Sequence, residues 1–68
     1  MFQITLAAAR VNAGMSQKDA AKKLGVSNKT LASWERGQYF PNAQKIDRIC
    51  ELYNIPVDNL IFLPRNNA

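Results

Sequence analysis

Three glycines divide the first half of the chain into segments that are short enough to be single helices. Gly14, Gly25 and Gly37 each follow a segment of helix-forming composition. Because glycine adopts the left-handed backbone conformation at little steric cost, it commonly marks the end of a helix. The spacing of the three glycines therefore predicts short helices joined by sharp turns.

Two serines predict where the second and third of these helices begin. Ser16 and Ser27 each precede a helical segment, where a side-chain oxygen can cap free backbone N–H groups. With the glycines as stops, the serines predict helices over residues 17–24 and 28–36. A three-residue turn that contains Gly25 joins the two helices.

Apolar residues predict further helices on both sides of this pair. Ile46, Ile49, Cys50 and Tyr53 follow the i, i+3, i+4, i+7 spacing of an amphipathic helix, and an alanine-rich segment lies near the N-terminus. No two segments alternate in the manner of paired strands, so no strand is predicted. The expected fold is all-α, a compact five-helix bundle in a single domain over residues 1–68. The helices are predicted over residues 4–13, 17–24, 28–36, 43–53 and 57–62.

The charge is basic and unevenly distributed. Nine Lys and Arg against five Asp and Glu give a net charge of +4, and eight of the nine cations lie between residues 10 and 48. Such a surplus suits a polyanionic partner, although by itself it more often marks a solvated surface. The partner has to be inferred from motifs.

The length and the missing residue types argue against catalysis. A chain of 68 residues has a small core and little room for a deep substrate cavity. The chain has no His and one Cys, so it lacks both a zinc-ligand set and a Cys-His or Ser-His nucleophile pair. We therefore expect no enzyme activity, no metal, no cofactor and no small-molecule ligand.

The same composition bears on location. The single cysteine, Cys50, allows no internal disulfide, and no long apolar run or charged-then-apolar leader is present. These features predict a cytoplasmic protein, in the bacterial cytoplasm or nucleoid, with no membrane partner.

Residues 17–36 have the features of a helix-turn-helix, in which two short helices cross at a tight turn. Gly25 can take the positive φ angle that the turn requires, and Ala21 is small enough to let the helices approach closely. A pair of amphipathic helices is also common in any small bundle, so this pair alone does not establish DNA binding.

A longer set of residues, in fixed order and at fixed offsets, extends from residue 4 to residue 62. The set comprises Arg10, Gly14, Met15, Ser16, Gln17, Ala21, Leu24, Gly25, Val26, Ser27, Leu31, Trp34, Glu35, Arg36, Gly37, Pro41, Val57, Asp58, Asn59, Leu60 and Ile61. With this set the chain resembles the Cro and phage-repressor (Xre-like) family of helix-turn-helix proteins. It departs from the family at Ala20, where leucine is usual, which implies a shallower core beneath the second helix.

The resemblance implies a lambda repressor-like DNA-binding domain whose third helix lies in the major groove of double-stranded DNA. Four residues of that helix are expected to face outward and contact bases: Asn28, Lys29, Thr30 and Ser33. Their chemistry is suitable, because Asn can pair with adenine, Lys can donate to guanine, and the hydroxyl residues can reach a base edge or a thymine methyl. Trp34 of the same helix is expected to be a core anchor.

The resemblance also implies residues that position the domain on DNA. Phosphate contacts are expected from Gln17, Ser27, Asn42, Gln44 and Lys45. Gln17 is placed where free N–H groups and the helix dipole favour a phosphate, and its amide can also brace Asn28. The family pairs the residues at Arg10 and Glu35, so this pair is expected to tie the first helix to the third.

A homodimer on a palindromic operator is the expected functional unit, because one such module buries too little surface for useful specificity. The expected interface consists of Asn59, Phe62, Leu63 and Pro64, with the alternative that Phe62 only completes the core. The resulting hypothesis is a transcriptional regulator, Cro- or repressor-like in class, from a bacterium, phage or mobile element. The alternative is an antitoxin-like or protein-interaction module that keeps the fold. The sequence does not decide whether Tyr39 and Phe40 pack on the core or stay exposed near DNA.

Overall fold

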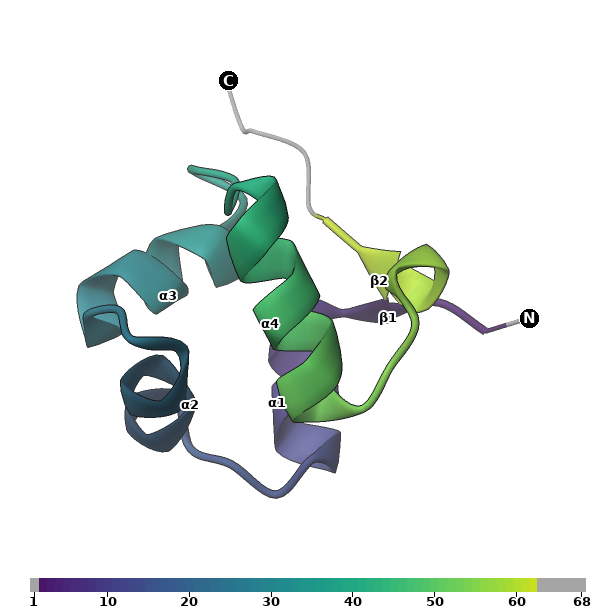
Figure 1. Ribbon diagram of the computed structural model, residues 1–68, viewed down its shortest axis with the longest axis horizontal. Helices are drawn as coiled ribbons and strands as arrows, with labels where there is room; N and C mark the ends of the chain where they lie inside the picture. The colour runs from purple at the N-terminus through teal and green to yellow at the C-terminus, as the bar shows by residue number, and fades with distance from the viewer. Residues whose placement is uncertain (1, 63–68) are drawn as a thin grey trace.

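The computed structural model describes residues 2–62, which form four α-helices, one short 3-10 helix and two short strands (Figure 1). The elements in chain order are β1 (Ile4–Thr5), α1 (Leu6–Asn12), α2 (Gln17–Leu24), α3 (Asn28–Arg36), α4 (Ala43–Tyr53), the 3-10 helix η1 (Val57–Asn59) and β2 (Leu60–Ile61). In Figure 1, α2 and α3 lie on one side of α4 and the strand pair lies on the other. The fold is therefore mostly helical and contains the expected helix-turn-helix.

Side-chain caps begin the helices where the sequence predicted. The hydroxyls of Ser16 and Ser27 each accept a 3.0 Å hydrogen bond from the backbone N–H three residues further on. Asn42 caps α4 in the same way, since its side-chain oxygen accepts from the N–H of Lys45 at 2.8 Å. These caps satisfy backbone donors that have no partner within the helix. The predicted bounds of the three central helices are confirmed.

Left-handed residues end the same helices. Gly25 closes α2 with a φ of 74°, and the N–H of Val26 donates to the carbonyl of Ala21 at 3.0 Å. Asn54 closes α4 with a φ of 55°, a conformation that asparagine tolerates better than most residues. Each turn thus satisfies carbonyl groups at the end of its helix.

The prediction of five helices was wrong at both ends of the chain. The segment predicted as a first helix over 4–13 begins with strand β1, and the segment predicted as a fifth helix over 57–62 is a single 3-10 turn followed by β2. The two strands pair in parallel, with Ile4 opposite Leu60 and Thr5 opposite Ile61. The segment 57–62 has six residues, too few for a stable helix. The extended strand β1 beside it supplies hydrogen-bond partners for its backbone instead.

The prediction that no strand is present was wrong for a related reason. Alternation of apolar and polar residues marks strands of several residues, whereas these strands have two residues each and lie far apart in the sequence. The side chain of Asn59 reinforces the pairing, because its Nδ2 donates to the carbonyl oxygen of Phe2 at 2.8 Å. The two chain ends are therefore joined across the domain.

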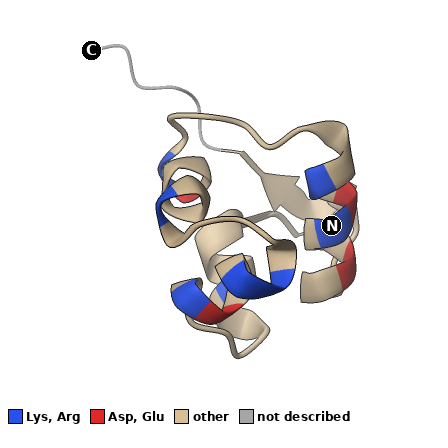
Figure 2. Ribbon diagram, turned by 60° about the vertical axis from the view of Figure 1, so that its left-hand side comes forward, with Lys and Arg blue, Asp and Glu red and all other residues tan. Residues whose placement is uncertain are grey.

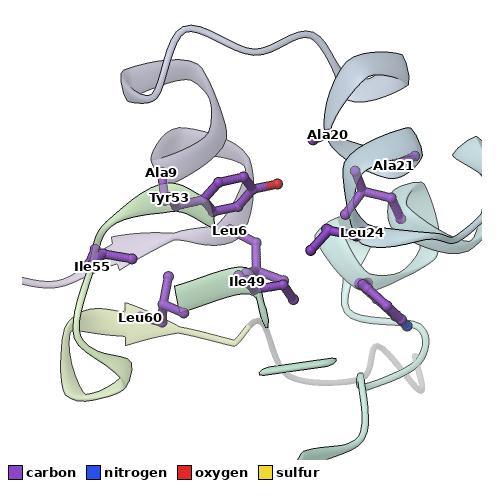
Figure 3. Packing of buried hydrophobic residues seen from close by; sticks show 11 residues of the cluster. Leu6, Ala9, Ala20, Ala21, Leu24, Ile49, Tyr53, Ile55 and Leu60 are labelled. Atoms are coloured by element: carbon purple, nitrogen blue, oxygen red, sulfur yellow. The ribbon is translucent and has the colours of Figure 1, made fainter. Parts of the chain in front are cut away.

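The core lies where these elements meet. Figure 3 shows buried side chains from α1, α2, α4 and β2 converging, among them Leu6, Leu24, Ile49 and Leu60. Trp34 of α3 is 7% exposed and belongs to the same cluster, which confirms its expected role as a core anchor. The residues of the cluster are Leu6, Ala9, Ala20, Ala21, Leu24, Leu31, Trp34, Ile49, Tyr53, Ile55 and Leu60.

The described residues place limits on other kinds of site. Among residues 2–62, no helix combines the length and the apolar character that crossing a bilayer requires. The same part of the chain brings together no group of three His, Cys, Asp or Glu side chains that could hold a metal ion.

Candidate nucleic-acid interface

The helices α2 and α3 are joined by the tight turn that a helix-turn-helix requires. Gly25 supplies the positive φ angle, and a Cβ built on it would meet only the Nζ atom of Lys45, at 3.8 Å. Ala20 and Ala21 lie on the buried face of α2 and are almost fully buried, so only small side chains separate this helix from its neighbours. The turn and the small residues together fix the angle at which α3 leaves α2.

The first turn of α3 offers polar side chains to solvent. Asn28 and Lys29 are exposed, and Thr30 is half-buried. Ser27 holds this turn in shape, since its hydroxyl accepts from the N–H of Thr30 and donates to the Thr30 hydroxyl, both at 3.0 Å. Two of the four residues predicted to contact bases are therefore exposed on a capped helix end, and a third lies beside them.

The prediction that Ser33 faces outward was wrong. Ser33 is 9% exposed, and its hydroxyl donates a 2.7 Å hydrogen bond to the carbonyl oxygen of Thr30. A serine within a helix can satisfy its own hydroxyl in this way, because the carbonyl of the preceding turn is within reach. Helical spacing alone placed Ser33 on the polar face and did not register this local bond.

Arg10 and Glu35 form the predicted ion pair between α1 and α3. Arg10 Nε lies 2.8 Å from Glu35 Oε2, with the two side chains 15% and 7% exposed. A second guanidinium nitrogen, Nη2, donates to Glu35 Oε1 at 3.4 Å, so the carboxylate is held through both oxygens. Arg10 also donates to the carbonyl of Met15 at 3.0 Å, which fixes the connection that leads into α2.

Gln17 joins this pair as a third member. Its Nε2 donates to Glu35 Oε1 at 3.0 Å, so the N-terminus of α2 is tied to the last turn of α3. The family resemblance implied that the Gln17 amide can also brace Asn28, whereas in the structure it donates to Glu35. The carboxylate is a stronger acceptor than an amide, which accounts for the choice.

Tyr53 lies close to this network. Burial in the first place, and the negative charge of Glu35 in the second, raise the pKa of the Tyr53 hydroxyl to about 12, although the positive charge of Arg10 opposes the shift. Within the described part of the chain, the buried hydroxyl oxygen has no hydrogen-bond partner. The tyrosine is therefore held in its neutral form beneath the ion pair.

Two cations of α4 bind the C-terminal end of α2. Lys45 Nζ donates to the carbonyl of Leu24 at 2.9 Å, and Arg48 Nη2 donates to the carbonyl of Lys23 at 3.4 Å. Positive charge at this end of a helix interacts favourably with the helix dipole. Sequence reasoning assigned Lys45 to DNA phosphates and missed this contact, because no local pattern relates a residue in α4 to the end of α2.

The other residues expected to contact phosphates lie at the N-terminus of α4. Asn42 and Gln44 are both exposed, and Asn42 also caps the helix. Figure 2 shows Lys and Arg residues distributed over the helices of the domain, with fewer acidic residues among them. Lys22 and Lys23 of α2 are exposed, as expected for solvated residues.

The residues expected at a dimer interface have different environments. Asn59 is 8% exposed and is bonded to the carbonyl of Phe2, so its side chain serves the fold of the single chain. Phe62 is half-buried and packs against the core, and its ring meets that of Phe40 edge to face with centroids 6.3 Å apart. Leu63 and Pro64 lie outside the described residues. Tyr39 and Phe40, whose packing the sequence left open, are 61% and 58% exposed.

Comparison with known proteins agrees with this geometry. The helix-turn-helix family model matches residues 6–60. The HTH-type transcriptional regulator ImmR of Bacillus subtilis is 38% identical over 53 residues, which are 78% of this chain and 42% of that protein. An HTH-type transcriptional regulator of Archaeoglobus fulgidus is 33% identical over 51 residues, which are 75% of this chain and 73% of the relative. The cryptic phage CTXphi transcriptional repressor RstR of Vibrio cholerae is 25% identical over 61 residues, which are 90% of this chain and 55% of that protein.

The chain thus spans less than half the length of ImmR and about half the length of RstR. None of the solved structures compared with the chain matches it. The family match extends over both helices of the motif and over the elements that support them, and the resemblance expected from the sequence is confirmed. The chain belongs to the helix-turn-helix family.

Proposed function

We propose that the chain is the double-stranded DNA-binding domain of a transcriptional regulator, with α3 placed in the major groove. The observation that carries this proposal is the exposed pair Asn28 and Lys29 at the capped first turn of α3. The N-terminal residues of such a helix approach base edges in the helix-turn-helix geometry. The names of the relatives, which include regulators and a phage repressor, support the same function.

Direct base contacts are proposed for Asn28, Lys29 and Thr30. An exposed Asn can pair with N6 and N7 of adenine, and a Lys can donate to O6 and N7 of guanine. Ser33 was expected in the same group, but its hydroxyl proton is already bonded to the Thr30 carbonyl. We therefore assign Ser33 a role in shaping the surface beside the base contacts.

Phosphate contacts are proposed for Gln17, Ser27, Asn42, Gln44 and Lys45. Gln17 has one amide N–H on Glu35 and a second donor on the same nitrogen, which suits a phosphate at the start of α2. Lys45 has two further N–H donors besides the one that binds Leu24. These contacts would fix the register of the domain on DNA and would carry no sequence information themselves.

A dimer on a palindromic operator completes the proposal. Two domains bound to half-sites about one helical turn apart would gain the specificity that a single domain lacks. Of the described residues, Phe62 is the one we propose for the interface, since Asn59 is committed within the chain. Occupancy of an operator near a promoter would then exclude polymerase.

The test is selection of bound sites from random duplex DNA, followed by binding measurements over a range of salt concentrations. We expect a palindromic consensus and an affinity that falls steeply with salt, as phosphate contacts require. Lys29→Ala should relax the consensus at one position per half-site, whereas Gln44→Ala should weaken all sites alike. A selected pool that stays random, or binding that ignores salt, would reject sequence-specific control and would favour an antitoxin-like or protein-interaction module.

A further inference from the structure

A hollow of about 280 Å³ lies against α3 and the turn that follows it. Lys29 and Thr30, two of the proposed base-contact residues, line one part of it. Arg36, Gln38 and Tyr39 line another part and have no role in the function proposed above. The hollow therefore continues the proposed DNA surface along α3, beyond its N-terminal turn.

The lining is mostly apolar and carries positive charge. Most of the lining surface is apolar, and it includes the aromatic residues Trp34 and Tyr39. Ser33 also lines the hollow, but its hydroxyl proton is bonded to the carbonyl of Thr30 and is not free to bind a ligand. Lys29 and Arg36 bring two positive charges, and none of the described residues that line the hollow is acidic.

The turn after α3 is held by a side-chain contact of its own. Arg36 Nη2 donates to Gln38 Oε1 at 2.8 Å, so the two side chains are joined across Gly37. Gln38 N–H also donates to the carbonyl of Ser33 at 3.0 Å, which closes the end of the helix. Tyr39 thus follows a turn that is fixed by both backbone and side-chain bonds.

The size and chemistry of the hollow restrict what it can bind. Its volume is just below the roughly 300 to 1,000 Å³ of small-molecule pockets, so it suits a group that projects from a larger partner. In the major groove of unmodified DNA, the 5-methyl group of thymine is the one apolar group on a base edge. A mostly apolar lining that includes two cations matches such a methyl group with phosphates on either side.

We propose that this hollow receives the 5-methyl group of a pyrimidine in the bound half-site, which makes Tyr39 a specificity-determining residue. The inference rests on the proposed DNA-binding function and adds a base preference to it. Thymine and 5-methylcytosine carry the same methyl group on the same ring atom, so the chemistry identified is that of a 5-methylpyrimidine. The hydroxyl of Tyr39 is not required, because the contact is with the ring.

The test replaces each thymine of the selected duplex in turn with deoxyuridine, which removes the methyl group and keeps every hydrogen-bonding atom. We expect one thymine per half-site at which the change weakens binding roughly fourfold, as for the loss of one buried methyl group. In Tyr39→Ala this thymine and deoxyuridine should bind equally well, whereas Tyr39→Phe should keep the fourfold difference. Fluorescence anisotropy with labelled duplexes measures each affinity.

Phe2→Ala is the matched control, because Phe2 is an aromatic residue with 62% exposure against 61% for Tyr39 and does not line the hollow. It should keep the fourfold difference. A duplex with cytosine or 5-methylcytosine at the sensitive position distinguishes the two sources: a gain on methylation assigns the hollow to either pyrimidine, and no gain restricts it to thymine.

The outcomes separate this inference from the function on which it rests. A clear consensus in which every deoxyuridine is tolerated would overturn the inference and leave the DNA-binding proposal intact. A methyl effect that persists in Tyr39→Ala would likewise place the methyl contact elsewhere. The absence of any consensus would overturn both.

Discussion

The ammonium group of Lys45, in the first turn of α4, lies 2.9 Å from the carbonyl oxygen of Leu24, the last residue of α2. The carbonyl belongs to a helix end where the backbone acceptors lack intrahelical partners. A positive charge there is favoured both by the hydrogen bond and by the helix dipole. Leu24 immediately precedes the turn into α3, the proposed recognition helix. Through Lys45, α4 therefore holds the end of α2 from which this turn begins.

The variant Lys45→Met should lower the free energy of unfolding by about 1 kcal/mol, because it removes the charged donor and keeps most of the apolar stem. Urea denaturation followed by circular dichroism measures the change. Lys18→Met is the control, since Lys18 is exposed in the first turn of α2, at the opposite end of that helix from the carbonyl that Lys45 binds. Equal stability of the two variants would show that the Lys45 contact contributes nothing.

The ion pair of Arg10 and Glu35 should be sensitive to loss of one partner. Both side chains are largely buried, so Glu35→Gln would leave the Arg10 charge without its counterion. We expect a loss of about 2 to 4 kcal/mol, as for a buried pair from which one charge is removed.

A double-mutant cycle with Arg10→Met provides the control for this prediction. The second substitution removes the stranded charge, so the double variant should be more stable than the sum of the two single losses predicts. Thermal or chemical denaturation of the four proteins gives the coupling energy. Strict additivity would mean that the two side chains act independently, contrary to the 2.8 Å contact.

Tyr53 should make stability fall at alkaline pH. Its pKa is raised to about 12 in the folded protein from the ordinary value of 10.0, first because the hydroxyl is buried and second because Glu35 is negative. The folded state therefore retains the proton at a pH where the unfolded state loses it. The contribution is fully present below pH 10 and is lost progressively as the pH rises toward 12, by about 2 to 3 kcal/mol in total.

The variant Tyr53→Phe tests this prediction. Subtracting its unfolding free energy from that of the parent protein at each pH cancels the titration of the lysines. The difference should be flat below pH 10 and fall above it. At neutral pH the variant should be as stable as the parent or more so, because the hydroxyl is buried without a partner in the described structure. A flat difference up to pH 12 would contradict the shift.

The central helices could be predicted from the sequence because their signals are local. Ser16, Ser27 and Asn42 cap helices through N–H groups three residues away, and Gly25 and Gly37 end helices through their own backbone conformation. Each signal acts within a few residues of the boundary that it sets. The bounds of α2 and α3 and the start of α4 follow from these residues alone, and Asn54 ends α4 in the same way.

The chain ends could not be predicted in the same way. The extended conformation of Ile4 depends on Leu60, at the other end of the chain, and neither residue lies in a segment long enough to show a strand pattern. Helical propensity instead favoured helices at both ends. The strands therefore depend on tertiary contacts, to which the bond from Asn59 to Phe2 contributes.

The sequence predicted which residues belong to the candidate site better than it predicted the hydrogen-bond partners of their side chains. The pairing of Arg10 with Glu35 followed from the family resemblance, but the same carboxylate also takes Gln17, which had been expected to brace Asn28. A polar side chain has several possible partners, and only the folded arrangement decides among them. The local hydroxyl bond of Ser33 is the same kind of choice, made within one helix turn.

Asn59 and Phe62, the two described residues that the family resemblance places at a dimer interface, should respond differently to substitution. Asn59→Ala removes a buried donor from the carbonyl of Phe2 and should cost about 1 to 2 kcal/mol of stability. It should leave the dimer unchanged at temperatures where the variant is folded. Phe62→Ala, by contrast, should weaken the proposed dimer, which sedimentation equilibrium and the affinity ratio between palindromic and half-site duplexes both measure.

Phe40→Ala is the control for Phe62→Ala, because it removes the same edge-to-face ring contact from the other side. If Phe62 acts only within the chain, Phe62→Ala should cost more stability than Phe40→Ala, because Phe62 also packs against the core, and neither variant should alter self-association. If Phe62 contacts a second copy, its replacement should lower self-association more than that of Phe40. Weaker association in a folded Asn59→Ala protein would instead show that the joined chain ends themselves form part of the interface.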